Sequence, residues 1–162
     1  MQYHLLKVGK ELGYDVIAAN NDLSKSYNDN SFSFLSLEKF PRLNVEPDVQ
    51  KTICLIDVIW FKKETDKIVC AFEVEKSTSI YSGILRLSDL YYSFRDSPST
   101  LYLIVPDKRK REVILQLSRP AIKGNNIDIR YILFSDLRKH CDALCTLGDS
   151  KEILKKIAHR AV

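Results

Sequence analysis

The chain has 162 residues, of which 45% are hydrophobic and 28% charged, which fits one globular domain and excludes a disordered or collagen-like chain. Its net charge of +4 permits a polyanionic partner without requiring one. Apolar runs such as 101–105 are far shorter than the ~20 residues of a membrane span, and charges interrupt the N-terminus too early for a secretory signal. We therefore expect a single cytoplasmic domain over residues 1–162 with no membrane partner.

The sequence of the first half predicts a helix, a short strand, a long irregular segment and then two more strands. In chain order, we expect a helix at 2–12, a strand at 15–20, a long loop or small subdomain at 20–51, and strands at 53–61 and 68–75. The turn between the last two strands is polar and of hairpin length, which favours antiparallel pairing there.

The second half alternates between helices and strands. We expect, in order, a helix at 80–94, a strand at 101–105, a helix at 108–117, a strand at 127–134, and helices at 135–146 and 150–160. This order predicts an α/β fold with a central β-sheet flanked by helices, and the early hairpin makes the sheet mixed rather than wholly parallel.

The four cysteines fit a reducing compartment. Cys54 and Cys70 lie in apolar, strand-like runs and are expected to be buried thiols. Cys141 and Cys145 are one helical turn apart, which suits a metal ligand pair or a disulfide, but the chain has no Cys-x-x-Cys motif. We expect two packed thiols and no zinc site.

Three acidic residues break the burial pattern of the predicted hairpin. Asp57 lies in the otherwise apolar run 53–61, and Glu73 and Glu75 lie in 68–75, on the strand expected to pair with it. Side chains alternate between the two faces of a strand, so Glu73 and Glu75 point the same way. If Asp57 pairs with the region of Glu73, three carboxyl groups converge on one face of the sheet.

Such a cluster of carboxylates needs compensation. Two like charges ~4 Å apart repel by ~4 kcal/mol at an effective dielectric constant of ~20. A raised pKa, a basic partner or a divalent cation would relieve this repulsion. Oxygen ligands suit Mg²⁺, with Mn²⁺ as a substitute, and such an ion can activate water at a phosphodiester. The pattern favours metal-dependent phosphodiester hydrolysis; an amphipathic hairpin with one solvated face is the alternative.

The arrangement resembles the PD-(D/E)XK nuclease superfamily, which includes restriction endonucleases and archaeal Holliday-junction resolvases. The resemblance covers roughly residues 5–106 and rests on a helix with an acid, an Asp, and then Glu-x-Glu before a helix. It assigns the first-helix acid to Glu11, metal-ligand roles to Asp57 and Glu73, and to Glu75 the position usually held by Lys. It implies a restriction-endonuclease-like core, Mg²⁺ and a DNA substrate.

The sequence departs from this pattern at the residues that would position the attacking water. Ile56 replaces the motif Pro, and Glu75 replaces the motif Lys. Lys76 lies one residue late and would face the opposite side of an ideal strand. Lys7 or Lys10 on the first helix could supply the missing charge.

A literal Pro-Asp dipeptide also occurs, at Pro47-Asp48. It lies in the segment expected to be irregular, before the apolar run begins, and nothing there orients it towards Glu73. We therefore expect Asp57, not Asp48, to be the motif Asp.

Basic side chains suggest where a DNA backbone could bind. Arg86 is spaced for an intrahelical ion pair with Asp89, and a place at the nuclease groove is the alternative. Four consecutive cations either begin a solvated helix or contact phosphates: Lys108, Arg109, Lys110 and Arg111.

Taken together, the residues and the resemblance predict a divalent-metal-dependent DNA endonuclease, restriction-enzyme-like or resolvase-like. The predicted metal ligands are Asp57, Glu73 and Glu75, with Glu11 as a further catalytic acid. Cleavage of both DNA strands would require a homodimer or a partner subunit. Two alternatives remain: a catalytically inactive DNA-binding or assembly subunit of the same fold, and a two-carboxylate glycosidase.

Overall fold

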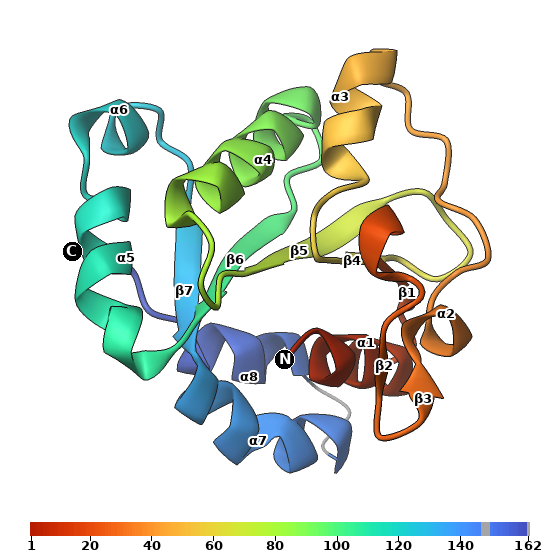
Figure 1. Ribbon diagram of the computed structural model, residues 1–162. Helices are drawn as coiled ribbons and strands as arrows, with labels where there is room; N and C mark the ends of the chain where they lie inside the picture. Colours follow the sequence, from red (N-terminus) through yellow and green to blue (C-terminus); the bar gives the residue numbers. More distant parts are fainter. Residues whose placement is uncertain (147–149, 162) are drawn as a thin grey trace.

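The computed structural model describes residues 1–146 and 150–161, with side chains described outside 141–153. A five-stranded sheet in the order β1-β4-β5-β6-β7 forms its centre (Figure 1). The strands are β1 (Asp15–Ala18), β4 (Val58–Phe61), β5 (Ile68–Val74), β6 (Thr100–Val105) and β7 (Ile129–Leu133). The pairs β1–β4 and β4–β5 are antiparallel, whereas β5–β6 and β6–β7 are parallel. The mixed α/β fold is therefore confirmed.

Helices cover both faces of this sheet (Figure 1). One face is covered by α1 (Gln2–Glu11), α7 (Phe134–Thr146) and α8 (Ser150–Ile157). The other face is covered by α3 (Pro47–Ile53), α4 (Ile80–Ser93), α5 (Lys110–Leu117) and α6 (Pro120–Lys123). The shorter elements are η1 (Asn20–Asp22), β2 (Ser26–Tyr27), β3 (Asn30–Ser31), α2 (Phe32–Leu35) and η2 (Asp107–Arg109).

Strand β4 shows why the sheet is buried on both sides. Val58 and Trp60 pack against the α1 side, while Ile59 and Phe61 pack against the α3 and α4 side. All four side chains are fully buried. A strand that is buried on both faces has a continuous hydrophobic sequence. Here the hydrophobic sequence begins at Ile53, before the strand itself starts at Val58.

Two predicted segments differ from the structure. The strand expected at 53–61 begins only at Val58, because α3 extends to Ile53 and a turn follows it. Pro47 stands in the first turn of α3, where its fixed φ and missing N–H favour a helix start. The segment 20–51, predicted as a long loop or small subdomain, contains several short helices and a two-stranded ribbon.

The apolar residues that suggested a longer strand are buried for another reason. Ile53 and Ile56 pack into the core from the end of α3 and the following turn. Cys54 is buried in that turn rather than in a strand, and Cys70 is buried in β5; both are free thiols. The side chains of Cys141 and Cys145 lie outside the described residues. Within the described residues, no helix combines the length and hydrophobicity needed to cross a membrane.

Candidate active site

The ends of β4 and β5 bring the predicted acids together. Asp57 immediately precedes β4, Glu73 is the penultimate residue of β5, and Glu75 follows that strand. The antiparallel register places Val58 opposite Phe72, so Asp57 lies beside the residues that end β5. The predicted pairing of Asp57 with the region of Glu73 is confirmed, although Asp57 lies in the turn before the strand.

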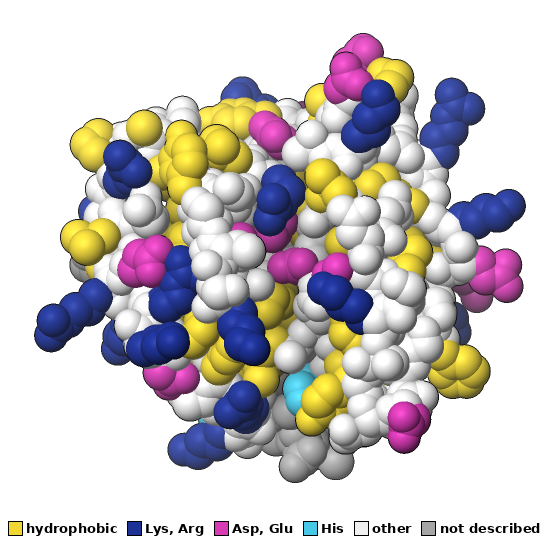
Figure 2. Space-filling view, viewed as in Figure 1, with side chains coloured by type: hydrophobic (Ala, Val, Ile, Leu, Met, Phe, Trp, Pro, Cys, Tyr) yellow, Lys and Arg dark blue, Asp and Glu magenta, His cyan; other side chains and the backbone are white. Residues whose placement is uncertain are grey.

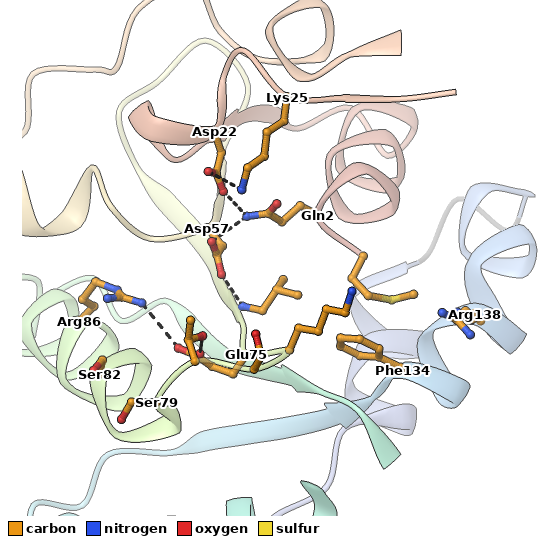
Figure 3. A pocket seen from close by; sticks show the side chains of 15 residues that line it. Gln2, Asp22, Lys25, Asp57, Glu75, Ser79, Ser82, Arg86, Phe134 and Arg138 are labelled. Carbon is orange, nitrogen blue, oxygen red and sulfur yellow. Dashed lines mark hydrogen bonds and ion pairs between the residues drawn. The ribbon is translucent and has the colours of Figure 1, made fainter. Parts of the chain in front are cut away.

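The carboxylate of Asp57 is held by two donors. Its Oδ2 accepts a hydrogen bond of 2.6 Å from the backbone N–H of Val74, and its Oδ1 accepts one of 2.7 Å from Nε2 of Gln2. The same Gln2 nitrogen lies 2.5 Å from Oδ2 of Asp22, whose other oxygen pairs with Lys25. Figure 3 shows this chain of contacts crossing from η1 to the end of β5. The orientation of Asp57 is therefore fixed by α1 and β5 together.

Glu73 is paired with an arginine rather than left beside the other acids. Nε and Nη2 of Arg86 each donate a hydrogen bond of 2.7 Å to one oxygen of Glu73, which is fully buried. Nη2 also lies 3.6 Å from Oε1 of Glu75. Of the two predictions for Arg86, the structure therefore favours a place at the groove over an intrahelical ion pair with Asp89. A basic partner is one of the three means of relieving clustered carboxylates.

Glu75 is held from both sides. Its side chain accepts a hydrogen bond from the hydroxyl of Thr78, and its backbone carbonyl accepts one of 2.8 Å from Nη1 of Arg109. Gly83 on α4 lies so close that a Cβ there would be 2.6 Å from Oε1 of Glu75. The absence of a side chain at Gly83 lets α4 approach the acidic end of the strand.

Burial and neighbouring charges perturb two of these acids. Burial raises the pKa of Asp57, the charges of Asp22 and Glu75 add to this rise, and the hydrogen bonds from Val74 and Gln2 oppose it. Burial also raises the pKa of Glu73 to about 8, although the donors of Arg86 act in the opposite direction. A raised pKa is thus a second form of compensation at this site.

The acids line a cleft of ≈ 820 Å³ (Figure 3). Within the described residues its charged lining comprises three acids and four cations: Asp22, Asp57, Glu75, Lys25, Lys76, Arg86 and Arg138. Figure 2 shows acidic side chains at the centre of this face with Lys and Arg around them. The basic side chains of such a cleft attract a negatively charged substrate. Its acidic side chains can coordinate a cation.

The three acids predicted as metal ligands do not all line the cleft. Among the described side chains, no three His, Cys, Asp or Glu residues form a group that could hold a metal ion. Glu73 is turned to Arg86 and does not line the cleft, whereas Asp57 and Glu75 do. Two carboxylates with several water molecules are sufficient for Mg²⁺, so the donor set fits a two-carboxylate site.

Several other predicted residues lie away from the cleft. Glu11 is exposed at the C-terminal end of α1, so the structure does not place it with the acids. Gln2, at the opposite end of that helix about 13 Å away, reaches the site instead. Lys10 donates to the carbonyl of Phe34, and Asp48 pairs with Lys51 on the surface of α3.

Lys76 lies on the cleft wall, contrary to the expectation that it would face away. The alternation of side chains no longer applies there, because β5 ends at Val74 and the chain turns. The cationic run at 108–111 begins beside the site, since Arg109 contacts Glu75 and also pairs with Glu112. The other members, Lys108, Lys110 and Arg111, are exposed.

Gln2, Asp22 and Arg138 were not expected at the site. Asp22 lies in a polar Asn-Asn-Asp run that is typical of a loop, and only its burial in the structure distinguishes it. Gln2 lies in the first turn of α1 and Arg138 in the second turn of α7, and these two helices pack together at the edge of the cleft. No local pattern in the sequence indicates these positions, because each depends on packing between distant segments.

Comparison with known proteins identifies the family. A family model for the C-terminal domain of the type II restriction enzyme NmeDI matches residues 1–160. The type II restriction enzyme NmeDI of Neisseria meningitidis serogroup C is 28% identical across the whole chain, which spans 45% of that relative's length. No solved structure matches the chain. Because the family model covers nearly every residue, the chain belongs to the family of NmeDI-type restriction-enzyme C-terminal domains.

Proposed function

We propose that this domain is a Mg²⁺-dependent DNA endonuclease with a PD-(D/E)XK-like active site. The observation that carries the proposal is one cleft that two carboxylates, Asp57 and Glu75, line together with four cationic side chains. Carboxylates bind a divalent cation, and Lys and Arg bind a phosphodiester backbone. The 28% identity to a type II restriction enzyme supports a DNA substrate.

The residues of the cleft have distinct roles in this proposal. Asp57 and Glu75 would hold Mg²⁺, and hydrogen bonds from Gln2 and from the backbone of Val74 orient Asp57. A bound Mg²⁺ ion supplies an activated water and stabilises the charge that develops on the phosphate. Arg86, whose side chain is 28% exposed, would present part of its guanidinium to the phosphate while it remains hydrogen-bonded to Glu73.

The proposal is tested by nicking of supercoiled plasmid in the presence of Mg²⁺, Mn²⁺ or EDTA. We expect nicking by the wild-type protein with either metal ion and none with EDTA. The Asp57→Asn variant keeps the size of the side chain but removes its charge, so nicking should fall by roughly 100-fold or more. Isothermal titration of Mg²⁺ into both proteins should show weaker binding by the variant.

Asp48→Asn is the matched control for this experiment. It makes the same chemical change at a side chain that is 92% exposed on α3 and does not line the cleft. This variant should nick plasmid at the wild-type rate. Equal nicking by Asp57→Asn would show that the activity comes from another site or from a contaminant.

A catalytically inactive DNA-binding subunit is the second candidate. It is favoured by the pairing of Glu73 with Arg86, which removes one acid from the expected ligand set. Wild-type protein that binds duplex DNA but leaves plasmid intact throughout Mg²⁺ and Mn²⁺ titrations would support this candidate. The glycosidase alternative loses support, because Trp60, the one tryptophan of the chain, is buried and cannot stack on a sugar.

A single site of this size cleaves one strand. Cleavage of both strands therefore requires a second copy of the chain or a partner subunit, and we propose such an assembly on the DNA. Light scattering of the protein with and without a duplex measures its mass directly. A single copy per duplex, combined with cleavage of both strands, would contradict this part of the proposal.

A further inference from the structure

We propose that a second cleft contacts base edges of the DNA whose backbone lies in the first cleft. This inference rests on the proposed DNA-binding function and adds the surface that distinguishes one base pair from another. The second cleft has a volume of ≈ 730 Å³ and lies between η1, the segment 42–45 and α3. Its polar lining consists of Asn20, Asn21, Arg42, Asn44, Gln50 and Lys51.

The chemistry of this lining differs from that of the first cleft. It contains no acidic side chain among the described residues and is dominated by amides. An amide offers both a donor and an acceptor, whereas Lys offers only donors. In the major groove, Asn and Gln form paired hydrogen bonds with adenine, and Arg forms them with guanine. The second cleft is therefore suited to base edges rather than to phosphates alone.

Four of these side chains are available to a ligand. Asn20, Asn21, Arg42 and Asn44 are exposed, and within the described part of the chain they make no side-chain hydrogen bond or ion pair. Gln50, by contrast, is occupied by the fold. Its Oε1 accepts a hydrogen bond of 3.2 Å from the N–H of Leu43, and its Nε2 donates one of 3.4 Å to the carbonyl of Pro41.

These contacts of Gln50 fix the segment that carries Arg42 and Asn44. Leu43 is also buried, with a 4% exposed fraction, so the segment is anchored in the core between two exposed polar residues. A recognition surface benefits from such an anchored backbone, because less conformational freedom is lost on binding.

Two segments of the chain, around residues 20–22 and 55–57, each contribute residues to both clefts. Asn21 of the second cleft precedes Asp22 of the first, and Leu55 lies two residues before Asp57. Two residues of extended chain span at most about 7 Å, so the linings of the two clefts adjoin.

Hydrogen bonds also join these two segments of backbone to each other. The N–H of Asn20 donates to the carbonyl of Cys54 over 3.1 Å, and the N–H of Ala19 donates to that of Asp57 over 3.1 Å. The two clefts therefore adjoin in space, and in this proposal DNA whose phosphate lies beside Asp57 extends over the second cleft.

The test selects bound duplexes from a random-sequence DNA pool in EDTA, so that it does not depend on cleavage. We expect the wild-type protein to enrich a short sequence pattern. Arg42→Ala and Asn44→Ala should each reduce discrimination at one or two positions of that pattern by about 5- to 150-fold, the effect of one lost paired base contact. Lys110→Ala, on the exposed surface of α5, should instead weaken binding to all sequences equally.

Melting temperatures should be unchanged in both cleft variants, because the altered side chains are exposed and unbonded. The inference is overturned if both variants retain the wild-type pattern, or if the wild-type protein enriches no pattern. If the wild-type protein enriches a pattern that both variants weaken, but does not nick plasmid, the endonuclease proposal is contradicted and the base-contacting surface stays supported.

Discussion

Glu73 is fully buried, and because burial raises its pKa against the opposing contacts of Arg86, stability should depend on pH. Its pKa of about 8 in the folded protein compares with 4.5 for the ordinary group. Between these values the folded protein retains a proton that the unfolded chain has lost. The free energy of unfolding should therefore decrease as pH rises from about 4.5 to about 8, by on the order of a few kcal/mol.

Urea unfolding at about pH 5 and about pH 9 measures this effect. Glu73→Gln cannot ionise, so its unfolding free energy should change much less between the two conditions. Glu46→Gln makes the same change at an exposed residue and should follow the wild-type protein. An unaltered pH dependence in Glu73→Gln would assign the titration to another group.

At the scale of elements, the cationic residues 108–111 have two different roles: one makes contacts within the fold, and the others are exposed to a ligand. Arg109 ties the start of α5 to the end of β5 through Glu75 and Glu112, whereas its neighbours are exposed. Arg109→Lys keeps the charge but cannot reproduce the guanidinium contacts. We expect plasmid nicking to fall by about 10- to 100-fold because Glu75 is displaced, while DNA binding changes little.

Lys110→Ala should give the opposite result, with weaker DNA binding and little change in the nicking rate at saturating DNA. Fluorescence anisotropy of a labelled duplex and plasmid nicking separate the two quantities. Equal losses in both assays for both variants would mean that Arg109 and Lys110 act alike.

The sequence predicted the acidic cluster but not all of its partners. Glu73 and Glu75 could be placed on one face because strand alternation is local, and the polar turn before β5 indicated the hairpin. Asp57 was assigned to a strand because Ile53 and Ile56 are apolar, although they are buried from a helix end and a turn. The contacts of Gln2 and Asp22 join segments far apart in the chain, which a local pattern cannot indicate.

At the scale of the whole molecule, the clustered cations predict salt-sensitive DNA binding. Lys25, Lys76 and Arg138 line the first cleft, and Lys110 and Arg111 are exposed at the start of α5. Each phosphate contact contributes about 0.9 to the slope of log K against log salt concentration. Removing Lys110 and Arg111 together should lower the slope by up to about 1.8, as measured by anisotropy titrations over a range of salt concentrations.

Loss of affinity without a change in that slope would show that these two side chains do not contact phosphates. Arg95→Ala is a suitable control, because Arg95 lies over the ring of Tyr92 beyond the end of α4 and does not line either cleft.

The hairpin turn at 62–67 lies at the far end of β4 from Asp57. The strand spans four residues, so roughly 13 Å of extended backbone separates the turn from the acids. All six residues of the turn are exposed. A fluorescent label or an inserted peptide could therefore be attached there to report on DNA encounter, leaving the geometry around Asp57 undisturbed.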